Sequence, residues 1–97
     1  MQLRIVEEAI LELEEAIDFY EHQVQGLGLD LEFEIREAFN SILQSPKLFS
    51  ENKNQIRKYM VNRFPLIIHY SIHDKIIRIW AIAHSKRKPG YWKTRLK

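Results

Sequence analysis

Residues 56–83 read IRKYMVNRFPLIIHYSIHDKIIRIWAIA, and this stretch decides the fold class. It holds three runs of β-branched and aromatic residues, which favour strands, at residues 56–61, 64–72 and 76–83. Two residues separate the first two runs and three residues separate the last two, so each link is short enough for a hairpin turn. The stretch therefore predicts three antiparallel strands.

Upstream of these strands, apolar residues recur at steps of three and four, which is the period of an amphipathic helix. The first run is Ala9, Ile10, Leu13, Ala16, Ile17, Tyr20 and Val24. The second run is Leu31, Ile35, Ala38, Phe39, Ile42 and Leu43. Gly26 and Gly28 suit a tight turn between the two runs, and Pro46 ends the second. The pattern predicts an antiparallel helical hairpin whose acidic side chains face water.

The short, partly apolar segment Gln2 to Val6 precedes the first helix and is predicted to be a strand. The whole order is then β-α-α-β-β-β, an α+β fold in which the hairpin packs on one face of a small antiparallel sheet. Residues 1–97 are expected to form a single domain.

Strict alternation along the last strand divides its side chains between the two faces of the sheet. One face, expected to contact the helices, would hold Ile77, Ile79, Ala81 and Ala83. The opposite face would hold Ile76, Arg78, Trp80, Ile82 and His84. We expect this second, mixed face to be open to water or to a partner.

The formal charge of +2 conceals a division of charge along the chain. Residues 1–45 hold eleven acidic and two basic residues, and residues 46–97 hold thirteen basic and two acidic residues. Two interpretations fit this division: an acidic helical layer that neutralises a basic sheet, or a basic part that attracts a polyanion or an acidic protein. With no cysteine and no cluster of metal-ligating residues, neither a metal nor another cofactor is expected. The absence of a leader and of a long apolar stretch favours the cytoplasm and no membrane contact.

The tail, residues 84–97, combines six Lys or Arg residues with Tyr91 and Trp92. Cations neutralise phosphates and aromatic rings stack on bases, so the tail is a candidate binding segment. Because exposed Trp and Tyr are unfavourable, the tail is expected to dock on the sheet or on a partner. The candidate contacts for nucleic acid or another target are Arg57, Lys58, Arg63, Arg78, Lys86, Lys88, Trp92, Lys93 and Arg95.

Several of these cations would serve catalysis if they met at one end of the sheet. Arg57, Lys58, Arg63, Arg78, Lys86 and Arg87 together would stabilise the negative charge of a phosphoryl transition state. His84, beside these residues, is a candidate general acid or base, although a lone histidine at a strand end is more often structural. Chemistry of this kind would need no metal.

The sequence resembles the RelE/ParE superfamily of toxins, often called plasmid stabilisation proteins, over nearly its whole length. In the N-terminal half, the resemblance rests on Ala9, Leu13-Glu14-Glu15-Ala16, Tyr20, Gly26-Leu27-Gly28, Phe33 and Pro46. In the C-terminal half, it rests on Arg57-Lys58, Arg63-Phe64-Pro65, Tyr70, Ala81-Ile82-Ala83-His84, Arg87, Pro89, Tyr91 and Trp92.

The resemblance implies the toxin of a type II toxin–antitoxin system, which inhibits growth until a cognate antitoxin binds it. A homodimer within a toxin–antitoxin hetero-oligomer is one possible assembly. ParE-like members inhibit DNA gyrase, whereas RelE-like members are metal-independent endoribonucleases that cleave mRNA on the ribosome. An arginine usual near the start of the third strand of the nucleases is replaced here by Leu66-Ile67-Ile68, which favours the ParE-like function.

The nuclease function stays open beside gyrase inhibition. If the protein is a ribonuclease, His84, Arg87 and Tyr91 are its candidate catalytic residues, with Arg57 and Lys86 holding phosphate. A third hypothesis is a domain without toxicity that binds its antitoxin and takes part in repression.

Overall fold

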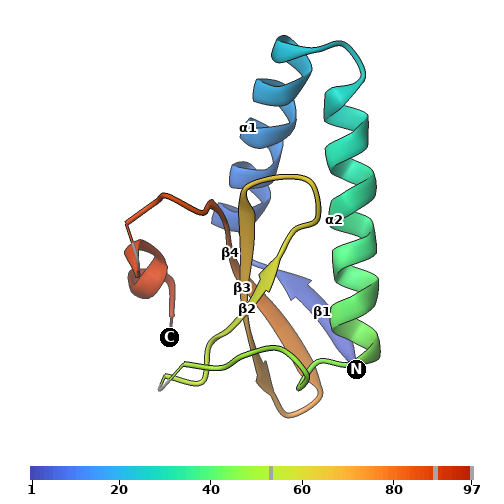
Figure 1. Cartoon of the computed structure of the whole chain (residues 1–97). Helices are drawn as coiled ribbons and strands as arrows, with labels where there is room; N and C mark the ends of the chain where they lie inside the picture. Colours follow the sequence, from blue (N-terminus) through green and yellow to red (C-terminus); the bar gives the residue numbers. More distant parts are fainter. Residues whose placement is uncertain (53, 89, 97) are drawn as a thin grey trace.

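The computed structural model describes residues 1–52, 54–88 and 90–96. The elements follow in the order β1 (Gln2–Ile5), α1 (Glu7–Gln23), α2 (Leu27–Gln44), β2 (Arg57–Met60), β3 (Leu66–His73), β4 (Ile76–His84) and the 3-10 helix η1 (Tyr91–Arg95). The predicted order of one strand, two helices and three strands is confirmed (Figure 1). Lys53, Pro89 and Lys97 lie outside the described residues.

The four strands form one sheet in the order β1-β4-β3-β2. The pairs β2–β3 and β3–β4 are antiparallel, as predicted. β1 instead lies parallel to β4, with Gln2 opposite Ile76 and Ile5 opposite Ile79. A parallel pair needs a long crossover, which the helical hairpin and the two intervening strands provide. The sheet is therefore mixed, with its parallel pair at one edge.

The turn between the helices depends on two glycines and one carboxylate. Gly26 has a φ of 90°, in the region that favours glycine. Both the Gly26 and the Gly28 backbone N–H groups donate to the Glu21 carboxylate at 2.9 Å, which lowers the pKa of Glu21. A Cβ atom on Gly28 would lie 2.9 Å from Glu21 Oε1 and 3.0 Å from the Ile17 carbonyl oxygen. Gly28 thus allows the first turn of α2 to lie against the end of α1.

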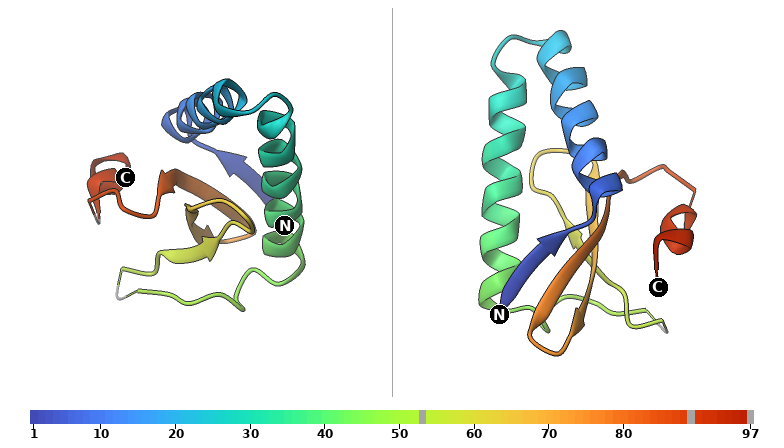
Figure 2. Two further views of the ribbon diagram at one scale, coloured as in Figure 1. Left: turned by 45° about the horizontal axis from the view of Figure 1, so that its top comes forward. Right: turned by 180° about the vertical axis from the view of Figure 1, so that it is seen from behind.

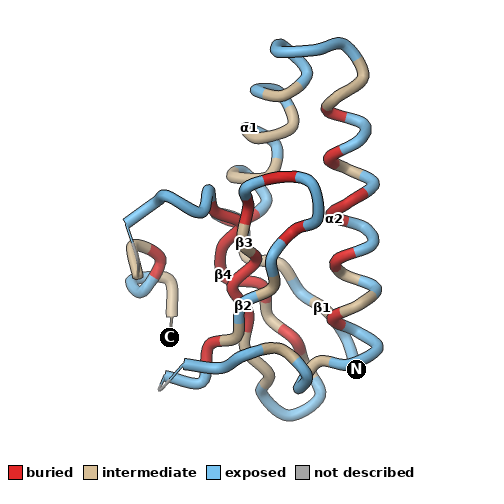
Figure 3. The backbone as a smooth tube through the Cα atoms, in the orientation of Figure 1, coloured by how far each residue is buried: buried red, intermediate tan, exposed pale blue. Residues whose placement is uncertain are grey.

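The main core fills the space between the hairpin and one face of the sheet (Figures 2 and 3). Its buried residues include Leu31, Ile35, Ala38 and Ile42 of α2, and Ile68, Tyr70, Ile77 and Ile79 of β3 and β4. The Tyr70 hydroxyl donates to the Pro46 carbonyl oxygen at 2.7 Å. This hydrogen bond ties the end of α2 to the middle of the sheet.

A β-bulge changes which side chains of β4 reach this core. Tyr70 lies opposite Ile79 and His69 lies opposite Ala81, so Trp80 is an extra residue on β4. The predicted alternation is right as far as Trp80 and wrong for Ala81 and Ile82. Ile82, rather than Ala81, joins the core beneath the helices, and Ala81 packs with Trp80 in a second cluster.

Candidate target-binding surface

The C-terminal segment docks on the sheet, on the side away from α2 (Figure 2). Trp92 of η1 is only 3% exposed and packs in a second core with Ile56, Trp80 and Ala81. The expectation that the tail docks rather than hangs free is confirmed. The expectation that this face of the sheet is open holds only in part, because the tail covers the region around Trp80 and Ala81 while Arg78 lines a hollow beside it. Trp92 is therefore a core residue and not an exposed stacking platform.

His69 lies beneath this docked segment. Its ring centroid is 5.0 Å from that of Trp92, and its Nδ1 atom is buried without a hydrogen-bond partner among the described residues. Burial, followed by the nearby Lys58 charge, lowers the pKa of His69 to about 4. The imidazole is consequently neutral near pH 7, as a stacked core side chain should be.

Glu12 of α1 joins the docked segment to the rest of the fold. Its carboxylate accepts hydrogen bonds from the Ile82 backbone N–H at 3.0 Å and from Arg95 at 3.0 and 3.1 Å. It also accepts a hydrogen bond from the Tyr91 hydroxyl. Helical periodicity places Glu12 on a solvated acidic face, and this expectation is wrong. No local signal in the sequence marks it, because its partners lie 70 or more positions away.

The other contacts of Arg95 and Tyr91 strengthen this junction. Arg95 also donates to the Trp80 carbonyl oxygen at 3.0 Å, and its hydrogen bond to Glu12 raises the pKa of its guanidinium. Burial, then the hydrogen bond to Glu12, raises the pKa of Tyr91 to about 12. The Tyr91 phenol therefore stays protonated at any physiological pH.

The three candidate catalytic residues do lie together. His84, Arg87 and Tyr91 line a groove of about 410 Å³ between α1 and the end of β4, whose apolar wall includes Phe19 and Tyr20. The Arg87 guanidinium lies 4.0 Å from the centre of the Tyr91 ring. His84 Nδ1 accepts a hydrogen bond from the Lys86 backbone N–H at 3.1 Å. The groove thus combines an apolar wall with an exposed cation, an imidazole and the carboxylates of Glu12 and Glu15.

Arg57, the predicted phosphate-holding residue, lies elsewhere and has its own partners. It donates to the carbonyl oxygens of Lys47 and Phe49 at 3.0 and 2.7 Å and pairs with Glu51 at 3.4 Å. In the register of the sheet Arg57 lies opposite Tyr70, whereas His84 lies opposite Leu66. These positions are ~13 Å apart along β3 at the rise of a strand.

The predicted convergence of cations at one end of the sheet is therefore wrong. Arg78, like Arg57, lies toward the other end, opposite Ser71, while Lys86 and Arg87 follow the end of β4. Arg63 pairs with Asp30 and Glu34 of α2 at 3.4 and 3.7 Å. Arg57 and Arg63 are thus occupied by contacts within the fold.

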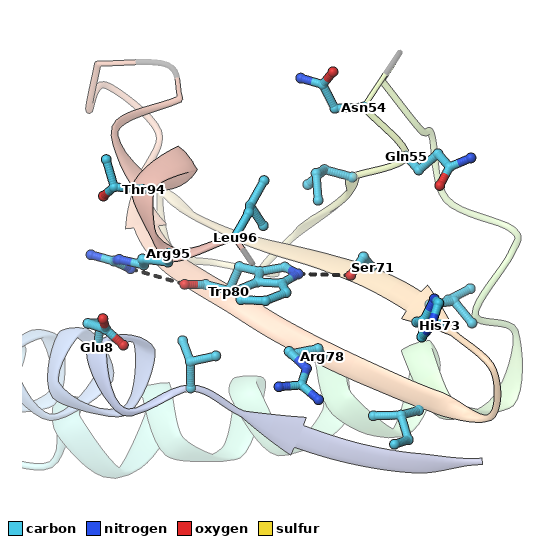
Figure 4. A pocket seen from close by; sticks show the side chains of 14 residues that line it. Glu8, Asn54, Gln55, Ser71, His73, Arg78, Trp80, Thr94, Arg95 and Leu96 are labelled. Atoms are coloured by element: carbon cyan, nitrogen blue, oxygen red, sulfur yellow. Dashed lines mark hydrogen bonds between the residues drawn. The ribbon is translucent and has the colours of Figure 1, made fainter.

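Arg78 lines a second and larger hollow of about 790 Å³, between the sheet and the C-terminal segment (Figure 4). Its guanidinium carbon lies 5.6 Å from the centre of the Trp80 ring, and Trp80 donates through Nε1 to Ser71 Oγ at 2.8 Å. Arg95 and Leu96 of the C-terminal segment form one wall. Of the predicted contacts, this hollow contains Arg78 and Arg95, while Lys58, Lys86, Lys88 and Lys93 lie exposed on the surface.

Comparison with protein families gives a match over nearly the whole chain. The model described as "ParE toxin of type II toxin-antitoxin system, parDE" matches residues 3–89. The chain belongs to this ParE toxin family. The matched range includes the groove residues His84 and Arg87 and ends just before η1.

A solved structure described as "Chromosomal ParDE TA system from P. aeruginosa" is similar to this ParE-family chain. The TM-score is 0.73 at 20% sequence identity, over 87% of this chain and 95% of the other. At this identity the likeness supports the shared fold. The comparison with curated proteins found no match.

In the part of the chain that the structure describes, no helix has both the length and the apolar character needed to cross a bilayer.

Proposed function

We propose that this ParE-family chain inhibits bacterial growth by binding DNA gyrase, and that a cognate antitoxin neutralises it. The family match over residues 3–89 supports a toxin of a type II toxin–antitoxin system. We propose gyrase as the target because the matching family is the ParE branch of the superfamily and not the nuclease branch.

The state of Tyr91 is the observation that favours binding over RNA cleavage. A nuclease that works by general acid–base catalysis needs a side chain that gives and takes a proton near pH 7. The Tyr91 hydroxyl instead donates to Glu12 and has a pKa of about 12. Arg57 is also occupied by two carbonyl oxygens and Glu51. Of the candidate set, His84 and Arg87 remain available to meet a substrate.

The groove at the end of β4 supports a site for the antitoxin. Phe19 and Tyr20 supply an apolar wall, and Arg87 supplies an exposed positive charge at the rim. A partner segment with apolar and acidic side chains would complement both features. An antitoxin bound in this groove would also cover Arg87 and His84. Antitoxin binding would then block toxicity, because these residues could no longer meet the target.

A ribosome-dependent ribonuclease is the second candidate function. The shared groove of His84, Arg87 and Tyr91 is the observation in its favour. In this mechanism His84 would move the proton and Arg87 would hold the phosphate, while Tyr91 would position substrate through its ring.

Induced expression in bacteria, combined with two assays on purified protein, tests these functions. Gyrase inhibition predicts growth arrest, loss of supercoiling activity and no new mRNA ends in primer extension. Cleaved mRNA with intact supercoiling would instead support the ribonuclease. In that case His84→Ala with Arg87→Ala should reduce cleavage by about 10²-fold or more while antitoxin binding persists. Unchanged growth would contradict both and favour a domain that only binds its antitoxin.

A further inference from the structure

We propose that Glu12 is a positioning residue that holds the basic C-terminal segment, residues 86–88 and 90–96, in the place where it completes the target-binding surface. This inference extends the proposed function and rests on it only for the toxicity measurement. Its basis is the position of one carboxylate at the meeting point of α1, β4 and η1.

Glu12 occupies a gap at the edge of the sheet. β1 ends at Ile5, opposite Ile79, so the following residues of β4 have no strand beside them on that edge among the described residues. A strand edge presents N–H and C=O groups that need partners. Glu12 accepts from the Ile82 N–H, and Arg95 donates to the Trp80 carbonyl oxygen. These two side chains therefore bind backbone groups of β4 that a neighbouring strand would otherwise bind.

The C-terminal segment depends on tertiary contacts. η1 spans five residues, and a 3-10 helix of this length is not stable without them. Besides Glu12, these contacts are the buried Trp92 and the partly buried Tyr91 and Leu96, all in the second core. The Glu12–Arg95 pair is stronger than a surface ion pair, because both side chains are only 15% exposed and the contact is bidentate.

The same segment forms a wall of both hollows. Arg87 and Tyr91 line the groove beside α1, and Arg95 and Leu96 line the hollow over Trp80. If the segment leaves the sheet, both hollows lose a wall, and Arg87 and Arg95 lose their fixed positions. Glu12 therefore governs the surface although it lies in the opposite, acidic half of the sequence.

Glu12→Gln is the direct test, with Glu14→Gln as its matched control. Glutamine keeps an acceptor for the Ile82 N–H but removes the charge that Arg95 and Tyr91 bind. Glu14 lies on the same helix and is exposed, so its change alters net charge equally. Arg95→Gln breaks the same contact from the tail, and it decides the question should Glu12→Gln fail to fold.

Release of the segment has two direct readouts. Both tryptophans belong to the second core, so quenching of their fluorescence by acrylamide should rise in Glu12→Gln. Trypsin cleavage after Lys93 should be faster by roughly tenfold, because loss of a charge-assisted hydrogen bond favours the open state by about that factor. Glu14→Gln should match the unmodified protein in both measurements.

Growth arrest at equal protein level separates positioning from a purely structural role. We expect Glu12→Gln to weaken growth arrest while its helices, followed by far-ultraviolet circular dichroism, melt as in the control. A segment that stays docked in both Glu12→Gln and Arg95→Gln would overturn the proposal, as would a released segment with full toxicity. If the unmodified protein does not inhibit gyrase, the proposed function fails, and fluorescence and proteolysis still decide whether Glu12 positions the segment.

Discussion

Glu12 and Arg95 lie 83 positions apart in the sequence and form a bidentate ion pair with N–O distances of 3.0 and 3.1 Å. The pair joins the first helix to the docked C-terminal turn. It also brings together the acidic and the basic halves of the sequence, whose separation is the strongest feature of the composition. The charge division therefore has a structural role as well as any role in attracting a partner.

Gly28→Ala should destabilise the helical hairpin. The new Cβ atom would lie 2.9 Å from Glu21 Oε1 and 3.0 Å from a backbone oxygen of α1, which cannot move freely. We expect the free energy of unfolding in urea to fall by about 1–3 kcal/mol. Asn40→Ala is the control, since it introduces the same residue at an exposed position of the same helix. Equal losses for the two variants would contradict this account of the turn.

The Tyr91 hydroxyl should ionise later than an ordinary tyrosine. Its pKa is raised from 10 to about 12, so the folded state keeps the proton that the unfolded state loses between these values. The stabilising contribution is then complete below pH 10 and is lost as the pH rises toward 12. The phenolate absorbance that disappears in Tyr91→Phe should titrate near pH 12. A midpoint near 10 would show that Glu12 does not hold this hydroxyl in solution.

Mild acid should weaken the second core through His69. Its pKa is lowered from 6.5 to about 4, so between these values the unfolded state binds more protons than the folded state. Stability should therefore fall as the pH drops from 6.5 toward 4. Thermal unfolding followed by tryptophan fluorescence should show this loss, and His69→Phe should reduce it. His73→Phe, at an exposed position, is the control, and its loss of stability in acid should equal that of the unmodified protein.

The exposed lysines near the end of β4 should contribute to target recognition. Lys86→Ala with Lys88→Ala removes two charges beside the groove, and Lys47→Ala with Lys75→Ala removes two exposed charges elsewhere. We expect the first pair to weaken gyrase inhibition by roughly tenfold at low salt, because local charge speeds association with an oppositely charged surface. Equal effects from both pairs would indicate a general charge effect rather than a local site.

The elements of the fold are predictable from the sequence because periodicity is a local property. The helices, the three C-terminal strands and the turn at Gly26 all follow from residues close together in the chain. The parallel pairing of β1 and the extra residue Trp80 do not, because they depend on which strands become neighbours and on the register between them. One extra residue is enough to exchange the faces of Ala81 and Ile82.

The site is predictable only in part. Composition singles out the basic, aromatic tail, and the burial of Trp92 follows the rule that exposed tryptophan is unfavourable. The structural roles of Arg63 and Glu12 are hidden, since a charged side chain on an amphipathic helix or in a loop looks the same whether or not it has a distant partner. Those partners come within reach only once the sheet has formed.

The parallel pairing of β1 with β4 also bears on the order of events during synthesis. β1 leaves the ribosome well before β4, its neighbour in the sheet, which ends at His84. Contacts between such distant segments form late and slow the search for the native state. In a nascent chain that stops before β4, the apolar face of the helical hairpin would therefore stay exposed, because the sheet that it packs against is incomplete. The target-binding surface would form only after β4 and the C-terminal segment have been synthesised.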